Sequence, residues 1–122
     1  AAVVEAIERS ARALRPGAAG WEVDQVARGH LTGSGYPEYA HALGHHLGRA
    51  VHDGGGVLGP RWERYGNEPF EPVRLGNVYT LEPSLWLEGH GLVSLEEDVV
   101  VGPEGARFLS RFPRELPILR RA

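Results

Sequence analysis

The spacing of apolar residues changes once along the chain, near residue 36, and this change constrains the fold most. Before it, apolar residues recur at the spacing of an amphipathic helix over residues 1–14 and again over 21–32. After it come two runs rich in β-branched and aromatic residues, 78–87 and 92–101, which predict strands. Two helices followed by a curved antiparallel sheet are typical of the α+β class.

Glycine and proline predict where these elements end. Proline cannot continue a helix and glycine turns the chain, so the first helix should end at Arg15-Pro16-Gly17. Gly33-Ser34-Gly35 should end the second helix in the same way. The other predicted elements are a short strand at 49–53, a long loop over 57–74, a turn at 89–91 and a hairpin closed by 106–109.

Composition excludes several functional classes. The net charge of −3 gives no basic surface for nucleic acid, and no apolar stretch is long enough for a membrane span. Residues 1–14 lack the basic leader and apolar block of a signal peptide, so we expect a cytoplasmic protein. Cysteine is absent, which leaves His, Asp and Glu as the side chains that could hold a metal ion.

Histidines and two strand carboxylates form the pattern that suggests chemistry. Four of the six histidines lie within twelve residues of one another: His41, His45, His46 and His52. Glu82 and Glu96 each lie inside an apolar strand, where a carboxylate is costly to bury unless it is paired or binds metal. Carboxylates on neighbouring antiparallel strands can face each other, and an added imidazole would complete a site for a divalent ion.

The residues alone leave a second interpretation open, in which these side chains only form hydrogen bonds within the fold. We interpret His30, His46 and His90 as structural, because nothing in the pattern assigns them a partner. Trp62, Tyr65 and Phe70 in the long loop either line a specificity pocket or cover the core: both interpretations remain.

Three motifs resemble those of one enzyme family. His41-x-x-Gly-His45-x-x-Gly-x-x-x-His52, Thr80-Leu-Glu82-Pro and Leu95-Glu96-Glu-Asp follow one another in the order of that family's H-x-x-G-H, T-I-E-P and R-I-E-D motifs. The likeness extends from Leu14-Arg-Pro-Gly17 to the tail at Leu109–Leu116. The chain thus resembles the M24 metallopeptidases, the creatinase, prolidase, aminopeptidase P and methionine aminopeptidase or "pita-bread" family.

The resemblance implies half of a pita-bread fold and a role for each motif residue. His45, Glu82 and Glu96 correspond to metal ligands, with Glu96 bridging two ions of Mn, Co, Fe or Zn. Glu82 would also carry a proton to the leaving amine, while His52 contacts the bond to be cleaved and His41 lines the substrate pocket. The implied reaction is hydrolysis of N-terminal peptide bonds through a metal-activated water, as in Xaa-Pro dipeptidase or aminopeptidase P.

The motifs also depart from the family pattern. His46 and Ser84 stand where glycines are usual, Asp53 replaces a glutamate and Ser94 replaces an arginine. The altered residues beside the ligands are expected to change the local backbone and the charge of the site.

The family's two aspartate ligands belong to a strand before the first helix, and neither Asp24 nor Asp98 fits that place. Residues 1–122 are therefore expected to be a partial catalytic domain that binds a peptide substrate. We expect it to form a homo-oligomer or to associate with the missing N-terminal half. The alternative is a non-catalytic module that binds peptides or proteins, or that dimerises.

Overall fold

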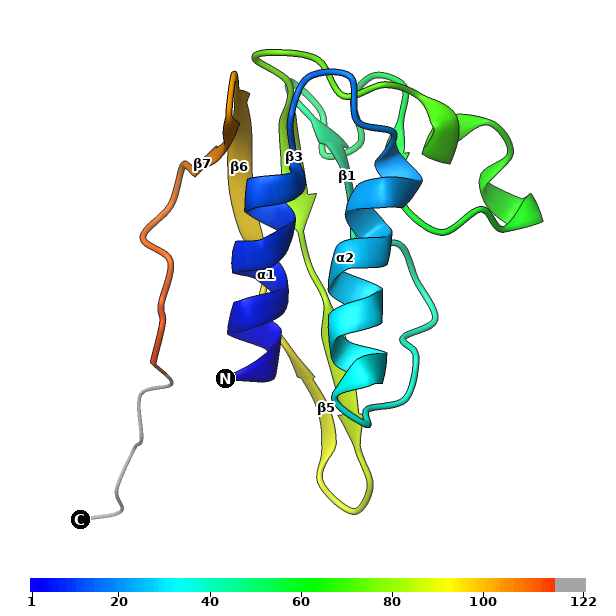
Figure 1. Cartoon of the computed structure of the whole chain (residues 1–122), viewed down its shortest axis with the longest axis vertical. Coiled ribbons are helices and arrows are strands. Elements are labelled where there is room, and N and C mark those ends of the chain that lie inside the picture. The colour runs from blue at the N-terminus through cyan, green and yellow to red at the C-terminus, as the bar shows by residue number, and fades with distance from the viewer. Residues whose placement is uncertain (116–122) are drawn as a thin grey trace.

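The computed structural model describes residues 1–115, in which two helices cover one face of an antiparallel sheet (Figure 1). The helices are α1 (Ala2–Ala13) and α2 (Gly20–Gly33). The strands are β1 (Gly44–Leu47), β2 (Val57–Leu58), β3 (Val78–Leu81), β4 (Ser84–Leu87), β5 (Gly91–Ser94), β6 (Glu97–Gly102) and β7 (Gly105–Phe108). Two short 3-10 helices, η1 (Glu63–Tyr65) and η2 (Glu68–Phe70), lie between β2 and β3.

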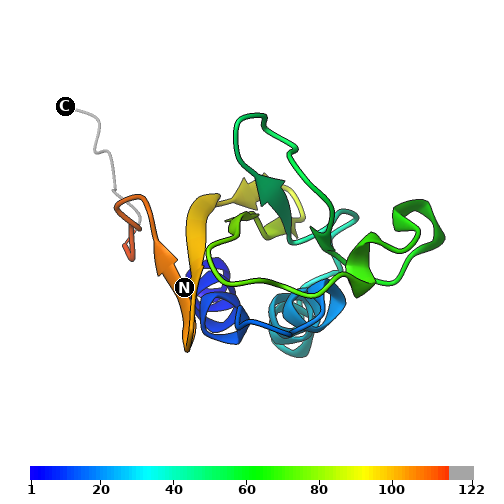
Figure 2. The same ribbon diagram turned by 90° about the horizontal axis from the view of Figure 1, so that it is seen from above.

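The sheet has two parts. Five strands pair in the order β2-β1-β3-β6-β7, and β4 pairs with β5 in a separate ribbon that extends beyond the helices (Figure 1). Seen from above, both helices lie on one side of the strands, and the loop after β1 rises on the other side (Figure 2). The predicted succession of two helices and an antiparallel sheet is confirmed. Within residues 1–115, neither helix is long and apolar enough to cross a membrane.

The strand predicted at 49–53 is wrong, because the chain forms β1 five residues earlier and then turns. The backbone N–H of Asp53 donates to the carbonyl of His46 at 3.1 Å, which closes the intervening segment into a loop. The Asp53 carboxylate also accepts from the backbone N–H of Arg49 at 2.8 Å. Residues predicted to form a strand therefore make hydrogen bonds within a loop instead.

The two long strands predicted at 78–87 and 92–101 are present, but each is interrupted. Pro83 has no N–H to donate, and the ladder stops there. Leu81 pairs with Glu97 on the β3–β6 side of the gap, and Ser84 pairs with Ser94 on the β4–β5 side. The two ladders share one continuous register. That register sets Glu82 opposite Glu96, at the point where the backbone ladder is open.

The core lies between the helices and the sheet. Its helical side is a stripe at three- and four-residue spacing, with Val3, Ile7 and Ala11 on α1 and Val23, Ala27 and Leu31 on α2. The buried stripe of α2 also contains Asp24 and Arg28, which are 1% and 5% exposed. Charged side chains are seldom buried so deeply unless they are paired.

Asp24 and Arg28 form a two-point ion pair inside this stripe. Arg28 Nε and Nη2 lie 2.7 and 2.8 Å from the two carboxylate oxygens of Asp24. The remaining donors of Arg28 reach the carbonyls of Tyr39 and His41 at 2.7 and 2.8 Å. Asp24 in turn accepts from the backbone N–H of Leu43 at 3.0 Å. The pair therefore fixes three backbone points of the segment that leads into β1.

Replacing Arg28 with alanine should destabilise the chain by about 3–5 kcal/mol, because Asp24 would remain buried without its partner. Chemical denaturation of residues 1–122 measures this loss. Arg9→Ala is the matched control: Arg9 is exposed on α1, and its replacement should change the free energy of unfolding by less than about 0.5 kcal/mol. Equal losses for both variants would contradict a structural role for the pair.

Candidate active site

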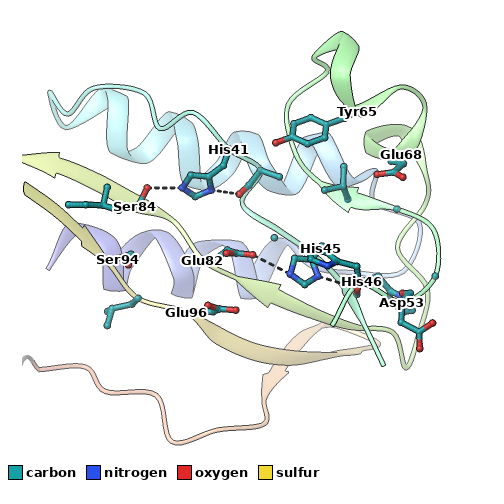
Figure 3. Close-up of a pocket in the computed structure, with 18 residues that line it drawn as sticks. His41, His45, His46, Asp53, Tyr65, Glu68, Glu82, Ser84, Ser94 and Glu96 are labelled. Carbon is teal, nitrogen blue, oxygen red and sulfur yellow. Dashed lines mark hydrogen bonds and ion pairs between the residues drawn. The ribbon is translucent and has the colours of Figure 1, made fainter. Parts of the chain in front are cut away.

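A cavity of about 590 Å³ opens among β1, the loop after it, the 3-10 segment and the interrupted strands (Figure 3). The close-up shows α1 and α2 behind the strands that carry the site, so the cavity lies on the face away from the helices. All five residues predicted for the site line this cavity: His41, His45, His52, Glu82 and Glu96. The structure thus brings together side chains that are up to 55 positions apart in the sequence.

His45 and Glu82 are the most closely placed pair. His45 Nε2 lies 3.5 Å from Glu82 Oε1. Thr80 connects them, because its hydroxyl accepts from the backbone N–H of His45 and donates to Glu82 Oε1, both at 3.0 Å. The backbone N–H of Glu82 also donates to the Leu43 carbonyl at 2.7 Å. Pairing of β1 with β3 therefore holds the imidazole and the carboxylate together.

Glu96 faces the same cavity from the opposite strand and is solvent-exposed. Partial burial raises the pKa of its carboxyl, and the neighbouring charges of Glu82 and Asp98 raise that pKa further. His45 acts in the opposite direction. A carboxylate whose ionisation is opposed by neighbouring negative charge is stabilised when a cation lies beside it.

The side chains of His45, Glu82 and Glu96 are of types that bind divalent metals, but they are not grouped as in a complete metal site. One imidazole and two carboxylates are ligands that suit manganese, iron, cobalt or zinc. Within residues 1–115, however, no three His, Asp or Glu side chains come close enough together to hold a metal ion. The roles of His45, Glu82 and Glu96 as metal ligands therefore stay a prediction.

The loop after β1 places His52 against His45. The two imidazole rings are tilted, with their centroids 4.1 Å apart, although His52 is exposed. His46 anchors the base of this loop through a hydrogen bond from its Nδ1 to the carbonyl of Asp53. His46 thus makes a hydrogen bond for which the sequence pattern gave no partner, and it also lines the cavity.

Gly44 permits the close approach of β1 to β3. A side-chain Cβ at this position would lie 1.9 Å from the carbonyl oxygen of Thr80, far inside contact distance. The glycine of the His41-x-x-Gly44-His45 motif therefore has a steric cause. It lets the backbone beside His45 reach the strand that carries Glu82.

The 3-10 segment contributes cavity residues for which the sequence gave little or no signal. Tyr65 lines the cavity, which supports the pocket interpretation for this aromatic residue. Glu68 lines it too, but no motif or periodicity marks this loop residue. Trp62 instead packs its ring 5.0 Å from the Arg28 guanidinium, and Phe70 is 52% exposed. The path of the folded loop decides which of these residues line the cavity and which do not.

A model of Metallopeptidase family M24 matches residues 1–103. The chain is 32% identical over 115 residues to the Xaa-Pro dipeptidase of Pyrococcus furiosus, covering 93% of this chain and 31% of that protein. Among solved structures, a dipeptidase from Pyrococcus horikoshii matches with a TM-score of 0.83 and 34% identity, over 97% of this chain and 31% of that one. An X-Pro aminopeptidase from Thermotoga maritima matches with a TM-score of 0.79 and 35% identity, over 93% and 30%.

These matches give the class of protein that the chain resembles, the metal-dependent peptidases. The chain belongs to Metallopeptidase family M24. The predicted half of a pita-bread fold is thereby confirmed. The chain spans less than a third of the length of these relatives, 31% for the P. furiosus protein. Leu116, the last residue of the tail that resembles the family, lies outside the described residues.

Gly44→Ala should push β1 away from β3 and cost at least about 1–3 kcal/mol of stability, as overpacking does. The NMR signals of the His45 imidazole should shift in the same variant. Gly33→Ala is the control, because a Cβ there meets nothing within 4 Å at the end of α2. Denaturation curves and ¹⁵N spectra make the comparison, and a Gly44→Ala chain as stable as the control would contradict the packing argument.

Proposed function

We propose that this chain is part of a metal-dependent exopeptidase that cleaves an N-terminal residue from proline, as an Xaa-Pro dipeptidase or aminopeptidase P does. The observation that carries the proposal is the meeting of His45, Glu82 and Glu96 in one cavity, in motifs shared with family M24. The names of the Xaa-Pro relatives support the substrate class. A cytoplasmic location is part of the same proposal.

His45, Glu82 and Glu96 would supply one side of a metal site for Mn, Co, Fe or Zn, normally as a pair of ions. When bound, such ions lower the pKa of a water and polarise a peptide carbonyl. The proposal assigns the remaining ligands to protein outside residues 1–122, because no three His, Asp or Glu side chains of the described residues are grouped closely enough to hold an ion. Residues 1–122 would then be a partial catalytic domain.

The chain's own residues would orient the substrate and move the proton. Thr80 donates to Glu82 Oε1 and so fixes the carboxylate that would pass a proton to the leaving amine. His52 lies beside His45, where an imidazole N–H could donate to the carbonyl oxygen as negative charge develops. His41 contributes to the cavity wall on the β4 side.

A non-catalytic binding module is the second candidate. The feature that favours it is the incomplete donor arrangement within residues 1–115. On this proposal the cavity receives a peptide, but no bond is cleaved. Metal affinity separates the two candidates, because only the peptidase needs ions held at His45, Glu82 and Glu96.

The full gene product that contains residues 1–122 should hydrolyse Xaa-Pro peptides in Mn²⁺ or Co²⁺, and chelation should abolish the activity. His45→Ala and Glu82→Gln should each lower kcat/KM by at least about a hundredfold, because each removes a metal ligand. Titration calorimetry with Mn²⁺ should show the same order of loss in affinity.

His90→Ala and Glu88→Gln are matched controls, since both residues are exposed at the hairpin turn and lie outside the active-site cavity. Both variants should keep the activity and the Mn²⁺ affinity of the parent protein. Tight Mn²⁺ binding without hydrolysis of any Xaa-Pro or aminoacyl peptide would contradict the peptidase proposal. Failure to retain Mn²⁺ at all would favour the binding module.

We further propose that the chain associates, with a second copy or with an N-terminal half. Trp86 and Leu92 form a cross-strand pair on the β4–β5 ribbon and are 59% and 63% exposed. Adjacent exposed apolar side chains of this size often mark an interface.

Sedimentation velocity of residues 1–122 should therefore show self-association, and Trp86→Arg should weaken it by adding a charge to the ribbon. Leu75→Arg is the control, because Leu75 is 64% exposed at a site away from the ribbon. A monodisperse monomer at all concentrations would exclude the homo-oligomer.

A further inference from the structure

Tyr65 lines the active-site cavity and is held in place from behind. Its ring stacks on the ring of Trp62, with the centroids 6.0 Å apart and the planes 14° from parallel. Trp62 in turn lies 5.0 Å from the guanidinium of Arg28, the cation of the buried ion pair. The backbone N–H of Tyr65 also donates to the Trp62 carbonyl at 3.0 Å, within η1. The helix layer therefore supports this part of the cavity wall through two stacked contacts.

Arg64 determines how the hydroxyl of Tyr65 forms hydrogen bonds. Arg64 Nη2 donates to Tyr65 Oη at 3.3 Å, and the same nitrogen donates to the carbonyl of Ala40. A guanidinium can only donate, so the phenol oxygen is the acceptor in this contact and keeps its own hydrogen for another partner. In the close-up, the hydroxyl end of Tyr65 is directed toward the His41 side of the cavity (Figure 3). Tyr65 therefore offers an O–H donor to a molecule in the cavity.

The chemistry of the proposed substrate limits which group can accept from this donor, and the inference rests on the proposed peptidase function for that substrate. An Xaa-Pro peptide begins with an ammonium group, which can only donate. The carbonyl of the bond to be cleaved is assigned to the metal ions and His52. The next acceptor along the main chain is the oxygen of the proline itself, a carboxylate in a dipeptide and a carbonyl in a longer peptide.

We propose that Tyr65 is a substrate-binding residue whose hydroxyl, oriented by Arg64, donates a hydrogen bond to the prolyl carboxylate or carbonyl oxygen of the peptide. Glu68 lines the same cavity and is the competing acceptor, but the Tyr65 hydroxyl bonds to Arg64 rather than to Glu68. The cation beside the phenol oxygen polarises the hydroxyl and strengthens its donation. The loop between β2 and β3 would thus hold the proline side of the substrate.

Kinetics of the full gene product test the contact. Tyr65→Phe should raise KM for the dipeptide Ala-Pro about fivefold to tenfold, with kcat changed less than about twofold, because a ground-state hydrogen bond is lost. Tyr36→Phe is the matched control, since it removes a hydroxyl outside the cavity and should leave KM unchanged. A loss confined to Ala-Pro identifies the carboxylate as the acceptor, and an equal loss for Ala-Pro-Ala identifies the carbonyl. An unchanged KM for both peptides would overturn the inference.

A double-mutant cycle tests the positioning role of Arg64. Arg64→Ala should raise KM for Ala-Pro about threefold in the parent enzyme but less than about 1.5-fold in the Tyr65→Phe enzyme, because Arg64 acts through the hydroxyl that phenylalanine lacks. The same loss in both backgrounds would show that Arg64 does not act through Tyr65.

Binding without turnover separates the inference from the proposed function. Titration calorimetry of Ala-Pro with the Glu82→Gln protein should show an affinity that Tyr65→Phe lowers about fivefold to tenfold. If the parent protein binds Ala-Pro without cleaving it, the peptidase proposal fails, while this loss of affinity still supports the contact. Equal affinities with and without the hydroxyl would overturn the contact even in an active peptidase. A parent protein that neither binds nor cleaves Ala-Pro would overturn both.

Discussion

The Asp24–Arg28 ion pair is the interaction on which the site depends. The pair lies among the buried apolar residues of α2, where an unpaired charge would be strongly unfavourable. Burial alone would lower the pKa of Arg28, but its hydrogen bonds to Asp24 and the charge of Asp24 raise it overall, so the guanidinium remains charged. Because the pair also binds the backbone at Tyr39, His41 and Leu43, the helix layer determines where β1 begins and therefore where His45 stands.

Burial decreases from this ion pair toward the proposed reaction centre. His45 and Glu82 are joined through Thr80 and through the pairing of β1 with β3, so their contact follows directly from backbone structure. Glu96 lies at the surface, and partial burial of its carboxyl, together with the charge of Glu82, raises its pKa. In the proposed function, metal ions would offset the repulsion between the two carboxylates.

Much of the fold and of the candidate site was predictable from the sequence, because the signals lie in short segments of the chain. Helical periodicity predicted both helices, and the motifs predicted the five residues that meet in the cavity. The strand at 49–53 was mispredicted because Val51 and His52 suit a strand, while the hydrogen bonds of Asp53 that close the loop leave no periodic trace. Glu68 was missed because its approach to the cavity depends on the path of an irregular loop. Arg28 pairs locally with Asp24, but its contacts with the carbonyls of Tyr39 and His41 lie more than ten residues away, and no local pattern encodes them.

The shared register of the two ladders limits how the hairpin from β3 to β6 can vary. Side chains alternate between faces along a strand, so one residue inserted between Glu82 and Ser84, or between Ser94 and Glu96, would break the common register of the two ladders beside the carboxylates. Matched additions at the turn around Gly89 would leave both carboxylates on the same face, because they lengthen the two arms equally. Relatives should therefore differ in length mainly at the tip of this hairpin, while the distance between the residues at the positions of Glu82 and Glu96 stays constant.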